Sequence, residues 1–147
     1  MTVIENTLGN IRSRKTHGAL VGVPFEWFEC SRGRIKKTAD DGREFGIAIP
    51  GGVNEGDILM EDESVYVVRV LPTELTEIRF HSAEEAARIG FELGNRHLPL
   101  KIEHERILTP HDEPTMRHML HLGFEARAFT GCFSGFTVCR AHGHSHD

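Results

Sequence analysis

The stretch of residues 75–102, LTEIRFHSAEEAARIGFELGNRHLPLKI, decides the fold of the second half of the chain. Its first six residues alternate apolar and polar side chains, which is typical of a strand with one buried face. The Ser82-Ala-Glu-Glu85 sequence that follows is a capping box and predicts the start of a helix. Ile89 and Leu93 give this helix an apolar face at helical spacing. This helix is predicted to end at Gly94-Asn95, because both residues tolerate left-handed backbone.

The residues beyond this helix predict two strands, a second helix and a last strand. The strands cover residues 98–102, 106–108 and 124–129. The second helix runs from about Pro110 to Leu122, with Thr109 as its N-cap, Pro110 at its first position and Gly123 as its stop. The order β-α-β-β-α-β is the ferredoxin-like arrangement, in which two helices cover one face of a four-stranded antiparallel sheet.

The first half of the chain has a different character, with short apolar segments separated by turn residues. Five segments are strand-like: residues 19–23, 34–38, 44–49, 57–60 and 64–70. Asp41-Gly42 is a strong hairpin signal, and Pro50-Gly51-Gly52 is a break that no helix would survive. The sequence therefore predicts an α+β protein. A β-rich N-terminal domain covers residues 1–72, a ferredoxin-like domain covers 73–130, and a flexible histidine-containing tail covers 131–147.

Composition limits the class of function. The 147 residues include 17 Lys and Arg against 22 Asp and Glu, a net charge of −5, so no nucleic-acid partner is expected. There is no apolar run long enough for a membrane span, and the first residues lack the pattern of a secretory signal. Three cysteines, Cys30, Cys132 and Cys139, form no Cys-x-x-Cys pair, which argues against a disulfide framework. A cytoplasmic protein is the expectation.

Histidine is unusually frequent, with ten residues in the chain and three of them in the last six positions. His142, His144 and His146 are separated by single residues in a segment with no apolar face. Such a segment can wrap several imidazoles onto one ion, and imidazole suits Ni(II), Zn(II) and Cu(II). The alternative interpretations are a solubilising terminus and a remnant of cloning. Metal binding by the tail is the prediction.

His97 and His111 are the other candidate metal ligands. His97 lies between the predicted helix end and Pro99, so its backbone is restricted on both sides. A single histidine at such a position more often caps a helix or faces water than binds a metal. In a two-fold dimer, however, a histidine near the symmetry axis would supply two ligands, one from each subunit. His111 lies beside Asp112 and Glu113 as an auxiliary candidate. The remaining histidines are read as surface or structural residues: His17, His81, His104, His118 and His121.

The segment Phe91-Glu-Leu-Gly-Asn-Arg-His-Leu-Pro-Leu100 resembles the UreE family of urease accessory proteins, whose hallmark is a Leu-Gly-Asn-Arg-His helix end before a strand with Pro. The resemblance extends to residues 56–59, 74–80 and 112–123. It implies a homodimer, with an N-terminal domain likened to the peptide-binding domain of a chaperone and a ferredoxin-like domain that binds metal and dimerises. It further implies that His97 of both subunits binds Ni(II), with ligands added by the tail. Nickel would be delivered to apo-urease through a complex with the urease accessory GTPase (UreG).

The chain also departs from the family pattern. Its tail has three histidines, fewer than long-tailed members carry, which argues against a large nickel store. Some members begin the second helix with His-x-His, whereas here only His111 of that pair is kept and Glu113 takes the other position. The cysteines at 132 and 139 leave the participation of a thiolate in metal binding open.

Three other classes of function are alternatives to a urease accessory protein. An enzyme needs a catalytic constellation, and the chain has no Gly-x-Ser-x-Gly elbow, phosphate-binding glycine loop or His-Glu-x-x-His helix. A general Ni/Zn/Cu buffer without a urease client is the stronger competitor, because ligand type alone does not name the metal. A peptide-binding or assembly module with incidental histidines is the third. The prediction is a metal carrier and not an enzyme.

Overall fold

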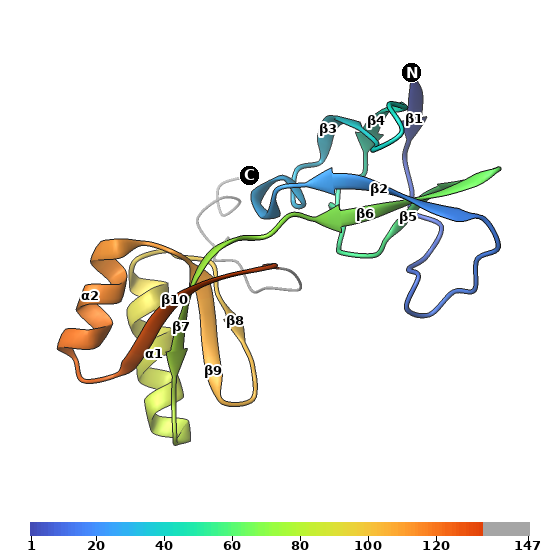
Figure 1. The fold of residues 1–147 in the computed structure, drawn as a ribbon. Coiled ribbons are helices and arrows are strands. Elements are labelled where there is room, and N and C mark those ends of the chain that lie inside the picture. The colour runs from blue at the N-terminus through green and yellow to red at the C-terminus, as the bar shows by residue number, and fades with distance from the viewer. Residues whose placement is uncertain (134–147) are drawn as a thin grey trace. The chain divides into compact units, whose positions relative to one another are not determined.

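The computed structural model describes residues 1–133 (Figure 1). The chain divides into two compact units, of which the first is Met1–Leu71 and the second begins at Pro72. Each unit has its own buried apolar core. Among the described residues, no helix is long and apolar enough to cross a membrane.

The first unit consists of two small mixed sheets. One has the strand order β1-β4-β3 and the other the order β2-β6-β5. The strands are β1 (Thr2–Ile4), β2 (Ala19–Phe25), β3 (Arg34–Thr38), β4 (Glu44–Ala48), β5 (Ile58–Glu61) and β6 (Ser64–Val70), with a 3-10 turn η1 (Trp27–Glu29). The pairs β1–β4 and β2–β6 are parallel. The sequence predicted five of these strands and missed β1.

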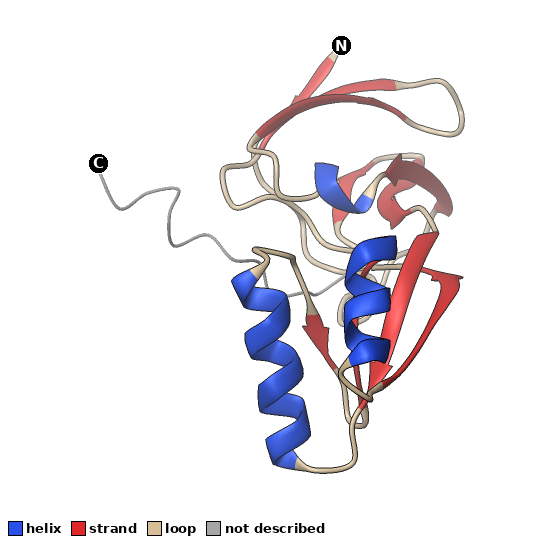
Figure 2. Cartoon of the chain, turned by 90° about the vertical axis from the view of Figure 1, so that its left-hand side faces the viewer, coloured by secondary structure: helices blue, strands red, loops and turns tan. Residues whose placement is uncertain are grey.

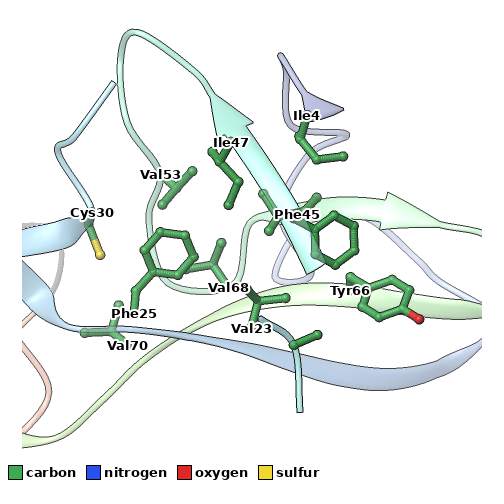
Figure 3. Close-up of a cluster of buried hydrophobic side chains, with 12 residues drawn as sticks. Ile4, Val23, Phe25, Cys30, Phe45, Ile47, Val53, Tyr66, Val68 and Val70 are labelled. Carbon is green, nitrogen blue, oxygen red and sulfur yellow. The ribbon is translucent and has the colours of Figure 1, made fainter. Parts of the chain in front are cut away.

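The core of the first unit is made by buried residues from several of these strands, including four consecutive ones in β6. Phe25, Phe45 and Val68 are almost completely buried, and the rings of Phe45 and Tyr66 meet edge to face with centroids 5.0 Å apart (Figure 3). The predicted hairpin is present: β3 and β4 pair antiparallel, and Gly42 has φ +93° in the turn between them, where a Cβ would be strained.

The second unit has the element order that the sequence predicts. Its elements are β7 (Thr73–Arg79), α1 (Ala83–Asn95), β8 (Lys101–Ile102), β9 (Arg106–Pro110), α2 (Glu113–His121) and β10 (Glu125–Gly131). The sheet has the order β10-β7-β9-β8, with every neighbouring pair antiparallel. Both helices lie on one face of this sheet (Figures 1 and 2). Ile78, Ile89, Leu93, Ile107 and Met119 are fully buried between the helices and the sheet.

The predicted start of α2 is wrong by three residues. Thr109 and Pro110 belong to β9, where they pair with Thr76 and Leu75. Helix α2 begins at Glu113, and its N-cap is Asp112, whose carboxylate accepts the backbone N–H of Thr115 at 3.2 Å. Residues 109 and 110 are in a strand and not in the helix because pairing with β7 and burial of Thr109 outweigh the preference of Thr109 to cap a helix. Pro114 takes the position in the first turn of the helix that was predicted for Pro110.

The sheet face opposite the helices buries a carboxylate. Glu77 in β7 is 2% exposed, and it accepts hydrogen bonds from Arg106 Nη1 at 2.7 Å and Arg127 Nε at 2.8 Å. Burial alone would raise the pKa of Glu77, but these two guanidinium groups hold it below its usual value. Both guanidinium groups also lie 5.4 Å from the ring centre of Phe129. The cluster therefore ties β7, β9 and β10 together.

Candidate metal centre

Helix α1 ends in a Schellman motif whose left-handed residue is His97. The backbone N–H of Leu98 donates to the Leu93 carbonyl at 3.1 Å, and that of His97 donates to the Gly94 carbonyl at 2.9 Å. These are the two hydrogen bonds that define the motif. The prediction that Gly94-Asn95 supplies the left-handed turn is wrong, because both residues are helical and His97 has φ +59°.

His97 occupies a backbone position that glycine normally fills. It is the one non-glycine residue with positive φ among residues 1–133, and left-handed backbone costs an ordinary residue about 1–2 kcal/mol. Leu98 packs against the core cluster directly after it, which holds the turn in place. The imidazole of His97 is exposed at this helix end. A local conformational cost at an exposed histidine is a feature typical of functional positions.

The turn that carries His97 is linked to the start of α2. Arg96 Nη1 lies 3.5 Å from Thr115 Oγ1, and the Thr115 hydroxyl also donates to the carboxylate of Asp112. Because Arg96 precedes His97 and Asp112 follows His111, these contacts bring the two predicted ligands to the same end of the helical layer.

His111 lies in the connection between β9 and α2. Its Nδ1 is 2.8 Å from Oγ1 of Thr76, which is fully buried, and its Nε2 is 3.4 Å from Oε1 of Glu113. Its backbone N–H donates to the Glu74 carbonyl at 2.9 Å. The ring is therefore held from two sides. Sequence reasoning missed the role of Thr76, although the alternating pattern of residues 75–80 already marked it as part of a strand.

The structure places none of the other predicted ligands beside His97 or His111. His142, His144 and His146 lie outside residues 1–133, as does Cys139. In the described part of the chain, no group of three or more His, Cys, Asp or Glu side chains is arranged to hold a metal. His97 and His111 are thus candidate ligands without a complete site formed by residues 1–133.

The remaining described histidines and cysteines have other contacts. His118 Nε2 lies 2.8 Å from Glu92 Oε1 and so joins α2 to α1, and His81 Nε2 lies 3.1 Å from Glu125 Oε2. Burial raises the pKa of the Cys30 thiol to about 11, so this thiol is protonated at neutral pH. Cys132, just after β10, is exposed.

Comparison with known proteins covers both units. Residues 4–71 match the family model described as the UreE urease accessory protein, N-terminal domain, and residues 73–147 match the corresponding C-terminal domain. The protein named urease accessory protein UreE from Bifidobacterium longum subsp. infantis is 44% identical over 145 residues, which are 97% of this chain and 66% of that relative. The chain thus spans slightly less than two thirds of that relative's length.

Two further relatives carry the same name. The one from Acetivibrio thermocellus is 30% identical over 152 residues, covering 98% of this chain and 99% of its own length. The one from Haemophilus influenzae (strain PittEE) is 28% identical over 136 residues, covering 84% of this chain and 72% of its own length.

Proposed function

Because the chain belongs to the UreE family of urease accessory proteins, we propose that it is a nickel-binding metallochaperone that delivers Ni(II) to apo-urease during assembly of the urease active site. In this role it is an accessory protein and not an enzyme, and nickel is its cargo. Its place of action is the cytoplasm. Its partners are the accessory GTPase and the complex of apo-urease with the other accessory proteins.

The observation that carries the proposal is the backbone of His97. A glycine at this position would avoid a conformational cost of about 1–2 kcal/mol, and an ordinary residue with such a local cost is typical of a functional position. The Schellman turn holds the ring exposed at a defined place, as a metal ligand requires. His97 is the fixed ligand, and His142, His144 and His146 are ligands that reach it from the tail. His111 is an auxiliary ligand.

A homodimer in which His97 of each subunit contributes to one nickel site is part of the proposal. Phe91, on α1 six residues before His97, is 69% exposed. On the same helix, a Cβ at Gly90 or Gly94 would meet nothing within 4 Å. An exposed aromatic ring beside two open glycine positions suits close approach of a second copy, because small residues let helices pack tightly. Two-fold symmetry would then supply His97 twice.

The two units have separate roles in this proposal. Residues 73–130 form a ferredoxin-like domain for metal binding and dimerisation, which the strand order β10-β7-β9-β8 with two helices on one face supports. Unit Met1–Leu71 is a peptide-binding-like domain that contacts the urease machinery. Its support is the match of residues 4–71 to the N-terminal family model.

Nickel calorimetry on variants tests the ligand assignment. His97→Ala should weaken nickel binding by more than about tenfold, because even residues behind a metal ligand contribute that much. A chain ending at Ala141, which lacks the three tail histidines, should bind fewer ions. His104→Ala, at an exposed histidine outside the proposed site, is the matched control and should bind nickel as the wild type does. If neither His97→Ala nor the truncation changes affinity or stoichiometry, the ligand assignment is wrong.

A transfer assay separates delivery from buffering. Nickel-loaded protein should activate the apo-urease complex in the presence of a competing chelator that prevents activation by free Ni(II). A general Ni/Zn/Cu buffer would give no more activation than the same amount of free nickel with chelator. That result would reject the delivery function and leave metal binding standing.

The pH dependence of nickel affinity reports the ligand type. Free imidazole has a pKa near 6.5 and binds a metal only when neutral, so protons compete with nickel as the pH falls. Affinity should therefore drop steeply between about pH 7 and pH 5 and level off above about pH 7.5. Titrations with nickel at several pH values measure this. An affinity that stays constant from pH 7 to pH 5 would exclude histidine as the main donor.

A further inference from the structure

Strand β10 is an edge of the second sheet, and β7 is its one hydrogen-bonded neighbour among residues 1–133. It has seven residues, whereas β8 at the other edge has two. An edge strand of this length presents a row of backbone N–H and C=O groups that can pair with a further strand. β10 is therefore the edge of this sheet that is suited to bind a partner strand.

The pairing of β7 shows to which side each of its residues directs its backbone groups. The Glu74 carbonyl accepts from the N–H of His111, and the Phe80 N–H donates to the carbonyl of Glu105. Both contacts are on the β9 side of β7. Successive residues of an antiparallel strand direct these groups to opposite sides. Even-numbered residues of β7 therefore point to β9, and odd-numbered residues point to β10.

The same alternation identifies the backbone groups of β10 that point away from the sheet. Glu77 points to β10 and pairs there with Arg127, so the odd-numbered residues of β10 point to β7. Ala126, Ala128 and Thr130 therefore direct their N–H and C=O groups outward. Within residues 1–133, no backbone group bonds to these three residues from the outer side.

The helix-covered side of this edge is apolar. Helix α2 packs against β10 and α1 packs against β9, so the side of α2 away from α1 lies at the β10 edge. His118 marks the opposite side, because its Nε2 lies 2.8 Å from Oε1 of Glu92 on α1. Leu120 is two positions further along, about 200° around the helix. Leu120 is 49% exposed, and Ala128 on the edge strand is exposed as well.

The open face of the edge carries two opposite charges. Glu125 and Arg127 are two residues apart and lie on the same face, with side chains 64% and 65% exposed. Arg127 bonds to Glu77 through Nε, so its terminal nitrogens can face a partner. In an antiparallel pair of β10 strands with a two-fold axis at Ala126, Glu125 of each copy lies opposite Arg127 of the other. The charge pattern of β10 is therefore complementary to itself.

We propose that β10 is a docking edge for β10 of a second copy of this chain, paired antiparallel around a two-fold axis at Ala126. The Ala126 N–H then donates to the Ala126 carbonyl of the second copy, and the Ala128 N–H donates to its Phe124 carbonyl. Symmetry forms each of these bonds twice and joins two four-stranded sheets into one. The α2 helices flank the junction and cover Leu120. This interface is separate from the one proposed at His97 and needs no nickel.

Sedimentation of the metal-free, full-length chain at increasing concentration tests the docking edge. Phe91→Lys serves as background, because it places a charge in the interface proposed beside His97. Ala128→Pro removes an outward N–H but keeps the bonds to β7, and edge strands accept proline at such a position. It should raise the dissociation constant at least about tenfold, since each copy loses a hydrogen bond.

Thr130→Pro is the matched control for this variant. Thr130 also directs its N–H outward, but it lies beyond the residues that pair in the proposed register, so the dissociation constant should stay as in the background. Thermal unfolding of both proline variants checks that the fold is kept. Equal dissociation constants for Ala128→Pro and the background would overturn the proposal.

Reversal of one charge tests the register. Glu125→Lys should weaken the pairing several-fold, and more at low salt, because it places two positive charges opposite each other. Glu105→Lys changes an exposed carboxylate outside β10 and should leave the pairing unchanged. If the two lysine variants associate equally well, Glu125 does not lie opposite Arg127 and the proposed register is wrong.

Amide hydrogen exchange gives a readout at single residues. A higher protein concentration should slow exchange at Ala126 and Ala128, whose N–H groups enter bonds between copies, and leave Thr130 unchanged. Protection that appears only after the apo-urease complex is added would assign the edge to another protein and overturn pairing between copies. None of these results bears on nickel binding at His97, which calorimetry measures separately.

Discussion

Glu77→Ala is expected to lower the free energy of unfolding by about 3 kcal/mol, the largest effect predicted for a single substitution in this chain. The Glu77 side chain is 2% exposed and accepts from both Arg106 and Arg127. Its removal leaves the two guanidinium groups without their partner and opens space in the sheet face. This loss of unfolding free energy is at the low end of the range for breaking a buried ion pair, because the Arg127 side chain is 65% exposed and water can solvate its charge.

The stability that Glu77 contributes should decrease as the pH falls below about 4.5. The pKa of Glu77 is lowered in the folded chain, so its ionised form stabilises the fold at every pH above the unfolded value near 4.5. As the pH falls below that value and through the folded pKa, this stabilisation is lost. The difference in stability between wild type and Glu77→Gln should therefore be constant above about pH 5.5 and shrink below about pH 4.5.

Urea unfolding at pH 7 and pH 4 measures both effects. Glu74→Gln is the matched control, because Glu74 lies on the same strand but is exposed. It should change stability by no more than about 0.5 kcal/mol. A Glu77→Ala protein as stable as this control would show that the arginine cluster contributes nothing to folding.

His97→Gly is expected to make the fold more stable and the metal site defective at once. Glycine adopts φ near +60° without steric cost, so the free energy of unfolding should rise by about 1 kcal/mol. The same change removes the imidazole, and nickel affinity should fall as far as in His97→Ala. Thermal or urea unfolding of the metal-free protein, together with nickel calorimetry, gives the two readouts.

Asn95→Gly provides the matched control for the sign of the stability change. Asn95 is the last residue of α1 and has helical backbone, so glycine there should lower stability by a few tenths of a kcal/mol, about the difference in helix propensity. If His97→Gly destabilised the protein as Asn95→Gly does, the left-handed conformation of His97 would not carry a cost.

Much of the second unit could be predicted from the sequence because its signals are local. Ser82 is the N-cap as predicted, with the Glu85 N–H donating to Ser82 Oγ at 3.1 Å. The Glu85 carboxylate, however, accepts the backbone N–H of His81 and not that of Ser82, so the predicted capping box is only half formed. Ile89 and Leu93 are fully buried as the helical spacing indicated. The second helix was harder to delimit. Leu120 is apolar and yet 49% exposed, whereas Thr115 and Met119, one turn apart, are buried.

The features that the sequence could not predict depend on contacts between distant residues. Strand β1 is three residues long and is defined by its parallel pairing with β4, more than 40 positions away. Thr76 and His111 are 35 residues apart, and only the register of β7 against β9 brings them together. The left-handed turn fell at His97 because the length of α1 is set by packing of Leu93 and Leu98, which overrides the local preference of Gly94 and Asn95.

The contrast between the two described cysteines has a practical consequence for labelling chemistry. At neutral pH, Cys30 is shielded from alkylating reagents by burial and by its protonated sulfur. Cys132, exposed at the end of β10, is open to them. With Cys139 replaced by serine, a maleimide dye or nitroxide would attach selectively at position 132. In the homodimer proposed above, two such probes, one on each copy of the chain, would report the distance between subunits in solution.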